Sequence, residues 1–281
     1  MNIGGYDLHP IETGRFALDG GAMFGVVPRT LWEKKNPPDG KNRIPMATRS
    51  LLLRGNGRTI LIDAGNGTKF DDKLTSIYRM DTSEFELHRS LARLGVSASD
   101  VTDVILTHLH FDHAGGATYR ENAEVKPTVP NATYYVQHEH WNAALQATER
   151  DRASFFPDDF MPLHERGVLQ FTEGEGEIFP GIGFRVVHGH TAALQCPLIS
   201  DGQTTLLYCA DLIPLAAHVQ LPWIMAYDLR PLVTLEEKRR ILNQSADEHW
   251  VLFLEHDPMV TAVRVKPTDR GIAFDDSVNL E

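Results

Sequence analysis

Four side chains that can bind a metal ion lie within six consecutive residues near the middle of the chain. They are His108, His110, Asp112 and His113, and a short apolar run precedes them. Three imidazoles and one carboxylate form a nitrogen-rich set that favours Zn²⁺ and also accepts Fe, Mn or Co. A lone histidine is usually a surface or core residue, but four such ligands at this spacing seldom arise by chance. The pattern therefore predicts a metal centre.

Three later side chains of the same chemistry each follow an apolar run that is typical of a strand. They are His190, Asp211 and His256. Side chains at the ends of separate buried strands can converge at one edge of a sheet, so we expect all seven residues to meet there. Asp63 repeats this placement, and we expect it to orient one of the ligands through a hydrogen bond.

The apolar patterns predict strands that alternate with amphipathic helices. The expected strands are 50–54, 59–63, 104–106, 133–137, 183–187, 195–200, 204–208 and 251–254, and the expected helices are 83–94, 139–146 and 235–249. Gly55-Asn56-Gly57 and Asp201-Gly202 are typical of tight turns between strands. Glu33 to Pro45 is expected to be a loop, and Gly115-Gly116 to let the backbone pass close by before the next helix. The fold class is therefore α/β or α+β, with sheets covered by helices.

Composition restricts the function further. The chain has 281 residues, 42% of them hydrophobic, and a net charge of -11, so we expect one globular domain over residues 1–281 that does not bind nucleic acid. No apolar run is long enough to span a membrane, and the N-terminus shows no secretory signal. Cys196 and Cys209 lie in apolar strands and are expected to be reduced thiols, which favours a cytoplasmic location.

The spacing H-x-H-x-D-H at residues 108–113 resembles the motif of the metallo-β-lactamase fold superfamily. The resemblance extends from Asp63, which matches the early aspartate of that family, to its last histidine at His256. It implies a four-layer αββα sandwich with two metal ions at one edge. The implied ligands are His108, His110 and His190 for the first ion, Asp112, His113 and His256 for the second, and Asp211 as the bridge between them.

The stretch Ala210–Gln220 and the pair Tyr227-Asp228 resemble the branch that contains methyl parathion hydrolases and N-acyl-homoserine lactonases. Pro214 stands where many lactonases carry a tyrosine that positions the substrate, so lactone turnover would need another donor. Two cations that share one water lower its pKa, and the bridging hydroxide attacks a carbonyl or phosphoryl centre. The resemblance implies that Asp112 orients this hydroxide and passes a proton to the leaving group.

We therefore expect a dinuclear metal-dependent hydrolase of esters or lactones that also accepts organophosphate triesters. The alternatives are a thioesterase of the glyoxalase II type, for which no basic glutathione site is evident, and a non-catalytic metal-binding regulator, for which a ligand would have to be lost. Five residues form the candidate substrate pocket. Three come from apolar stretches and two carry polar rings: Met23, Phe24, Trp223, His218 and Tyr227. Core packing or homodimer contact is the alternative for these stretches. If one lines the pocket, the small-molecule substrate has an apolar portion.

Overall fold

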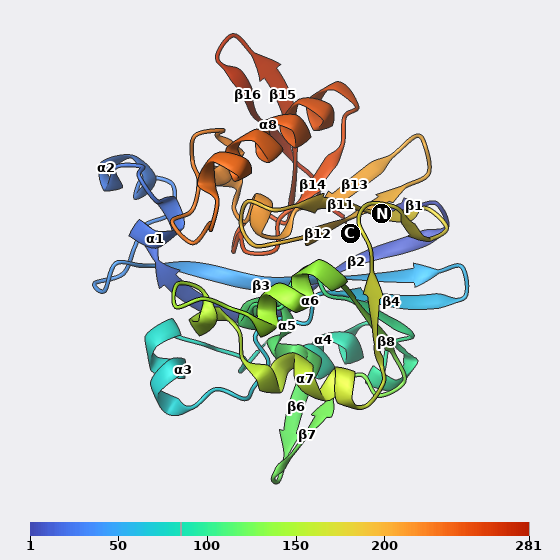
Figure 1. The fold of residues 1–281 in the computed structure, drawn as a ribbon. Helices are drawn as coiled ribbons and strands as arrows, with labels where there is room; N and C mark the ends of the chain where they lie inside the picture. The colour runs from blue at the N-terminus through green and yellow to red at the C-terminus, as the bar shows by residue number, and fades with distance from the viewer. Residues whose placement is uncertain (85, 281) are drawn as a thin grey trace.

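The protein is described here by a computed structural model that covers residues 1–84 and 86–280. Its strands form two seven-stranded sheets that lie face to face (Figure 1). The first sheet has the order β1 (Asn2–Ile3), β2 (Tyr6–Asp19), β3 (Arg43–Gly55), β4 (Arg58–Ile62), β5 (Asp103–Ile105), β8 (Thr133–Gln137) and β9 (Leu169–Thr172). The second has the order β10 (Glu177–Phe179), β11 (Ile182–Val187), β12 (Leu194–Ser200), β13 (Thr205–Tyr208), β14 (Val251–Phe253), β15 (Ala262–Thr268) and β16 (Gly271–Ser277).

Helices lie outside both sheets, and a separate hairpin projects from the first half. The α-helices are α1 (Gly20–Phe24), α2 (Arg29–Trp32), α3 (Asp72–Tyr78), α4 (Leu87–Arg93), α5 (Phe111–Ala114), α6 (His138–Leu145), α7 (Pro157–Glu165) and α8 (Pro231–Asp247). Short 3₁₀ turns occur at η1 (Ala98–Asp100), η2 (Gly115–Ala117), η3 (Arg152–Ser154), η4 (Ala210–Leu212) and η5 (Ala216–Val219). Strands β6 (Thr118–Glu121) and β7 (Glu124–Pro127) form the hairpin.

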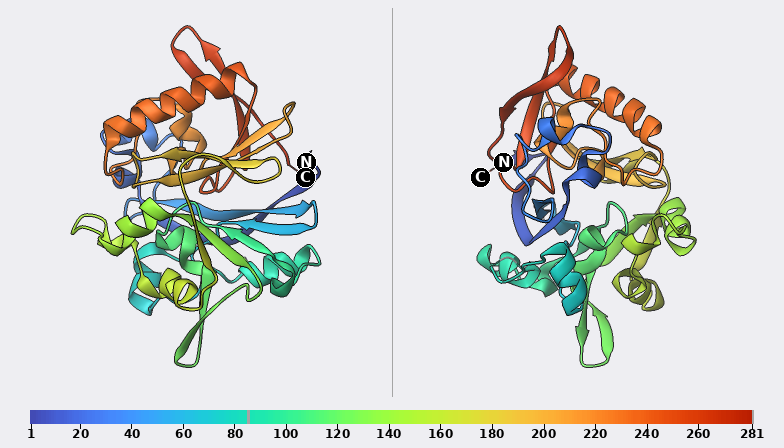
Figure 2. Two further views of the ribbon diagram at one scale, coloured as in Figure 1. Left: turned by 45° about the vertical axis from the view of Figure 1, so that its right-hand side comes forward. Right: turned by 90° about the vertical axis from the view of Figure 1, so that its left-hand side faces the viewer.

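The layers follow from the alternation of side chains along the strands. In β3, Leu51 and Leu53 face the second sheet, whereas Leu52 faces the helices outside the first sheet, where Trp141 of α6 packs. Ile241 of α8 packs in the cluster that includes the second sheet. Figure 2 shows α8 outside one sheet and the helices of the other half outside the other. The expected αββα sandwich is confirmed.

Several elements differ from the sequence prediction. The long strand β2 was not predicted, because Pro10 and Gly14 interrupt its pattern, and its pairing with β3 shifts register between Glu12 and Gly14. Arg43–Pro45 belong to β3 rather than to the expected loop, and Gly115-Gly116 form the start of η2, which leads into strand β6 rather than into an α-helix. The expected helix 83–94 appears as α4, while its Phe85 lies outside the described residues.

Two other expectations concern the whole chain. Both cysteines are buried and free, as predicted. Within the described residues, no helix combines the length and the apolarity needed to cross a bilayer. The two termini lie side by side in both views (Figures 1 and 2).

The strands that precede the predicted ligands end at a common edge. Strand β4 pairs in parallel with β5, and β13 pairs in parallel with β14, so the loops after each pair leave in the same direction. Asp63 follows β4, the histidine motif follows β5, and Asp211 and His256 follow β13 and β14. The fold thereby brings residues that are far apart in sequence to one place.

Candidate metal centre

The loop after β5 presents four side chains from one turn of chain. His108 and His110 precede α5, and His110 is its N-cap residue, while Asp112 and His113 lie inside the helix. All four side chains are buried. Because Asp112 and His113 lie in one helical turn, the helix backbone fixes the directions of their side chains.

Glycines allow this loop to pack against the loop after β4. Gly116 donates its backbone N–H to the carbonyl of Gly65 over 2.7 Å, and Ala64 donates to the carbonyl of His113 over 2.8 Å. A Cβ atom on Gly116 would lie 2.1 Å from the Ala64 carbonyl oxygen. Only glycine permits this approach, which holds Asp63 beside the histidine motif.

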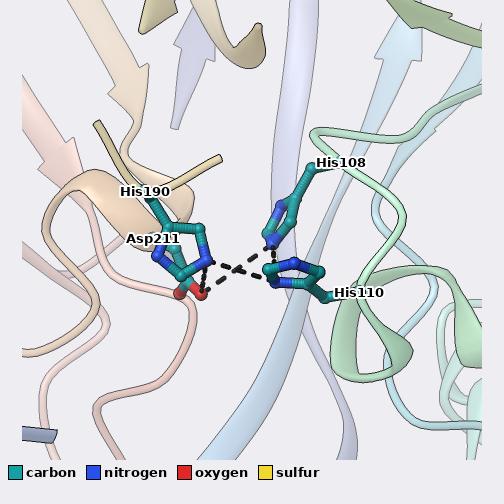
Figure 3. A group of neighbouring side chains, drawn as sticks. All are labelled: His108, His110, His190 and Asp211. Atoms are coloured by element: carbon teal, nitrogen blue, oxygen red, sulfur yellow. Dashed lines mark hydrogen bonds and ion pairs between the residues drawn. The ribbon is translucent and has the colours of Figure 1, made fainter. Parts of the chain in front are cut away.

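The first group of ligand atoms comes from three loops (Figure 3). It contains His108, His110, His190 and Asp211, whose ligand atoms all lie within 4.8 Å of one another. His110 Nδ1 is 3.0 Å from His108 Nε2 and 3.2 Å from His190 Nε2. The Oδ2 atom of Asp211 is 3.0 Å from His190 Nε2.

The second group contains Asp112, His113 and His256. The Nε2 atoms of the two histidines are 3.1 Å apart, and His256 Nε2 is 3.7 Å from Asp112 Oδ2. Asp211 reaches this group too, because its Oδ1 lies 3.1 Å from His256 Nε2. One oxygen of Asp211 therefore faces each group.

Hydrogen bonds on the far side of the rings fix which nitrogen faces inward. His190 Nδ1 donates to Asp228 over 2.9 Å, and His256 Nδ1 donates to the carbonyl of Ala47 over 2.8 Å. An imidazole that donates through Nδ1 in its neutral form presents a lone pair at Nε2. Lone pairs thus point into the cluster, as in metal sites whose histidines are oriented by outer partners.

Asp63, which we expected to orient a ligand, lies buried beside His113. The Nδ1 atom of His113 lies 3.0 Å from Asp63 Oδ2, and also 3.0 Å from Glu255 Oε2. Asp63 accepts two further bonds, from the backbone N–H and the hydroxyl of Thr107, each over 2.7 Å. Both carboxylate oxygens of Asp63 therefore accept hydrogen bonds. Glu255 is also buried, and burial raises its pKa.

The buried carboxylates require a positive charge nearby. Burial lowers the pKa of His190, but Asp211 and Asp228 outweigh this and raise it to about 10. Burial also lowers the pKa of His256, which Asp211 raises to about 9. By contrast, burial and the neighbouring imidazoles lower the pKa of His108.

Protons alone cannot satisfy this arrangement. If His113 and His256 both carried a proton on Nε2, two N–H donors would point at each other across 3.1 Å. Tetrahedral Zn²⁺ with ligands at about 2.0 Å keeps its ligand atoms about 3.3 Å apart, close to the spacings found here. The donor set therefore fits divalent cations in both charge and spacing.

Sequence reasoning missed three residues that hold these ligands. They are Asp228, Glu255 and Arg49, whose guanidinium donates to the carbonyls of Leu254 and Asp257, each over 2.9 Å, on either side of His256. Glu255 carried a local signal, a carboxylate at the end of a buried apolar strand, and Asp228 stood out only as part of the Tyr227-Asp228 pair. The other two act through contacts between distant segments.

A cavity of 280 Å³ opens onto the cluster. Its polar lining includes His110, Asp112, His190, Asp211 and His256. Its apolar lining includes Leu18, Met23, Met46, Phe111, Met225 and Leu229. A larger groove of 920 Å³ lies beside α8 and β16, but none of the clustered metal-binding side chains lines it. The smaller cavity is therefore the candidate active site.

The five predicted pocket residues divide into two sets. Met23 and Tyr227 line the cavity. Phe24, His218 and Trp223 instead pack behind it: the Phe24 ring stacks on His218 at 4.9 Å and meets Trp223 edge-on at 5.5 Å. His218 Nε2 bonds to the carbonyl oxygen of Met23 over 2.8 Å, and burial lowers the pKa of His218 to about 3. This neutral, enclosed ring supports the wall rather than forming it.

Known proteins share both sequence and fold with this chain. An N-acyl homoserine lactonase of Bacillus thuringiensis is 25% identical over 179 residues, which span 63% of this chain and 64% of that protein. The crystal structure of a probable metal-dependent hydrolase from Staphylococcus aureus has a TM-score of 0.90 at 28% identity, covering 99% of this chain and 98% of that one.

A third comparison extends the likeness in fold. AidC, a dizinc quorum-quenching lactonase solved in complex with a product, has a TM-score of 0.81 at 22% identity, covering 99% of this chain and 97% of that one. The family model of the metallo-beta-lactamase superfamily matches residues 43–256, from the start of β3 to the last clustered histidine. This chain belongs to the metallo-beta-lactamase superfamily.

Proposed function

We propose that the chain is a hydrolase that uses two divalent metal ions to cleave esters or lactones. The observation that carries this proposal is the buried cluster in which Asp211 places one oxygen 3.0 Å from His190 and the other 3.1 Å from His256. The ions would be held by His108, His110 and His190 on one side and by Asp112, His113 and His256 on the other. Zn²⁺ is the favoured metal, because nitrogen ligands dominate.

Divalent ions bound there would supply Lewis acidity and lower the pKa of a water that attacks the substrate. The protein supplies the rest. Asp63 and Asp228 hold His113 and His190 in the orientation that metal binding needs. Asp112 lines the cavity and would accept a proton at its carboxylate and return it to the departing oxygen.

The cavity supports a small-molecule substrate with an apolar portion. Met23, Met46 and Met225 line it, and methionine adapts its shape to varied apolar groups. The net charge of -11 disfavours polyanions, since long-range repulsion slows their approach at low salt. Neutral aryl esters and acyl lactones fit both features, and neutral organophosphate triesters remain compatible. The two buried free thiols support a cytoplasmic location.

A hydrolysis panel on metal-loaded protein tests the substrate class. It contains aryl esters, acyl lactones of increasing chain length, phosphotriesters, thioesters and nucleotide diesters under matched metal and salt. We expect the highest kcat/KM for neutral esters or lactones, with kcat/KM rising as the acyl arm grows, and little on nucleotide diesters. Diester or thioester rates above those for esters and lactones would contradict this proposal while leaving the metal centre untouched.

A further inference from the structure

We propose that the hydroxyls of Tyr227 and Tyr78 hold the leaving-group oxygen of the substrate at the mouth of the cavity. This inference rests on the proposed function as an ester or lactone hydrolase. Both tyrosines line the cavity that contains Asp112 and Asp211, and they come from separate parts of the chain. Together they would supply the substrate contact for which Pro214 offers no side-chain hydroxyl.

The backbone around Tyr227 is held on both sides. The preceding residue, Ala226, donates its N–H to the carbonyl of Ala22 over 2.8 Å and accepts a bond from Arg150 over 2.6 Å. The following residue, Asp228, bonds to His190 Nδ1 over 2.9 Å. The position of the Tyr227 ring is therefore tied directly to a residue that orients a proposed metal ligand.

Tyr78 is held from the opposite side of the motif. It is the last residue of α3, and its ring lies 5.0 Å from the ring of Phe111, which stands between His110 and Asp112 in the chain. Within the part of the chain that the structure describes, no side-chain hydrogen bond engages the hydroxyl of Tyr78 or of Tyr227. Both hydroxyls are thus free to bind a ligand.

Two other polar groups of the cavity, Arg150 and Asp151, are less suited to donate. Arg150 uses its guanidinium on the carbonyls of Ala226 and Asp228, over 2.6 and 3.4 Å. Asp151 accepts two bonds from Thr148 and has no proton to give when ionised. Both tyrosines line the same cavity as Asp112, whose charge contributes to raising the pKa of each phenol.

Both phenols stay protonated near neutral pH. Burial raises the pKa of Tyr227, and the charges of Tyr78, Asp19, Asp112 and Asp211 raise it further. Burial likewise raises the pKa of Tyr78, with a contribution from Asp112. A protonated phenol donates a hydrogen bond and keeps its proton.

The reaction then balances without a change in either tyrosine. Water adds its oxygen to the carbonyl carbon, the C–O bond to the leaving group breaks, and a proton from that water reaches the departing oxygen. In this proposal the departing oxygen lies on the side of the cavity that Tyr227 and Tyr78 line. Tyr227 is 39% exposed, so a ligand that enters from solvent can reach it.

The test compares Tyr227→Phe, Tyr78→Phe and the double variant with Tyr119→Phe, a matched control on β6 outside this cavity. Rates are measured on metal-loaded protein with a series of aryl and alkyl esters that differ in leaving-group pKa. We expect each cavity variant to lose about tenfold in kcat/KM on poor leaving groups and little on good ones, as for one lost hydrogen bond. Because both hydroxyls hold one oxygen, the double variant should depart from the product of the single losses.

Metal content and calorimetric binding of the alcohol product provide readouts apart from turnover. We expect unchanged metal content and weaker alcohol binding in the cavity variants, with Tyr119→Phe like the unmodified protein. Equal losses across all leaving groups, or no loss, would overturn the tyrosine assignment while the proposed function stands. If the unmodified, metal-loaded protein hydrolysed neither esters nor lactones, the proposed function itself would fail and the tyrosine assignment with it.

Discussion

We expect that replacing Asp211 by Asn lowers hydrolysis by more than about 100-fold, beyond the loss typical of groups that only orient a ligand. Asp211 places its two oxygens 3.0 Å from His190 and 3.1 Å from His256, so it contacts both groups of ligand atoms. An amide keeps the size but removes the negative charge that two cations need between them. Because each proposed ion would lose the ligand that it shares with the other, we expect loss of about one metal ion per chain, with the fold retained.

The matched control is Asp159→Asn. Asp159 is also a buried carboxylate, but its partner is Lys69 at 3.0 Å, and it belongs to neither group of proposed ligands. This variant should keep both its metal content and its turnover. Elemental analysis and steady-state kinetics decide the case: near-normal turnover with full metal in Asp211→Asn would show that Asp211 is not the bridge.

The second large effect is expected from replacing Asp63, which belongs to neither of the two ligand groups proposed to hold the ions. It accepts from Thr107 N–H and hydroxyl at 2.7 Å and from His113 Nδ1 at 3.0 Å, with no exposed surface. Asp63→Asn turns one acceptor into an N–H donor that faces another donor. We expect about 10–100-fold weaker metal affinity and about 1–3 kcal/mol less stability.

Metal titration and chemical denaturation of the metal-free protein measure the two effects separately. Glu255→Gln serves as the comparison, because Glu255 also lies 3.0 Å from His113 Nδ1, while burial raises its pKa and favours its neutral form. Its effect on metal affinity should be smaller. If Asp63→Asn bound metal as tightly as the unmodified protein, Asp63 would not orient the ligand.

The sequence predicted the cluster because its signals are local. The ligands follow apolar strands directly, and parallel pairing of β4 with β5 and of β13 with β14 brings strand ends together. The hairpin at Asn56-Gly57 was also predictable, since both residues adopt the left-handed backbone of a tight turn.

The cavity wall could not be predicted in the same way. Phe24 and Trp223 have the composition of a pocket wall, yet they pack behind it, whereas Tyr78 lines it from the end of a short helix without any sequence signal. Asp228 reaches His190 across 38 positions of sequence. Such placements depend on how loops cross in three dimensions, which neither periodicity nor spacing encodes.

The central claim is that the protein holds two metal ions in one centre. The most direct test measures the metal content of the protein and the return of activity when metal is added back. Protein purified without chelator is analysed for transition metals, stripped, and titrated with Zn²⁺ while hydrolysis of a neutral ester is followed. We predict about two ions per chain, from the two groups of ligands that share Asp211, with activity returning as the second site fills. Fewer than one ion per chain, with no gain on reloading, would contradict the account.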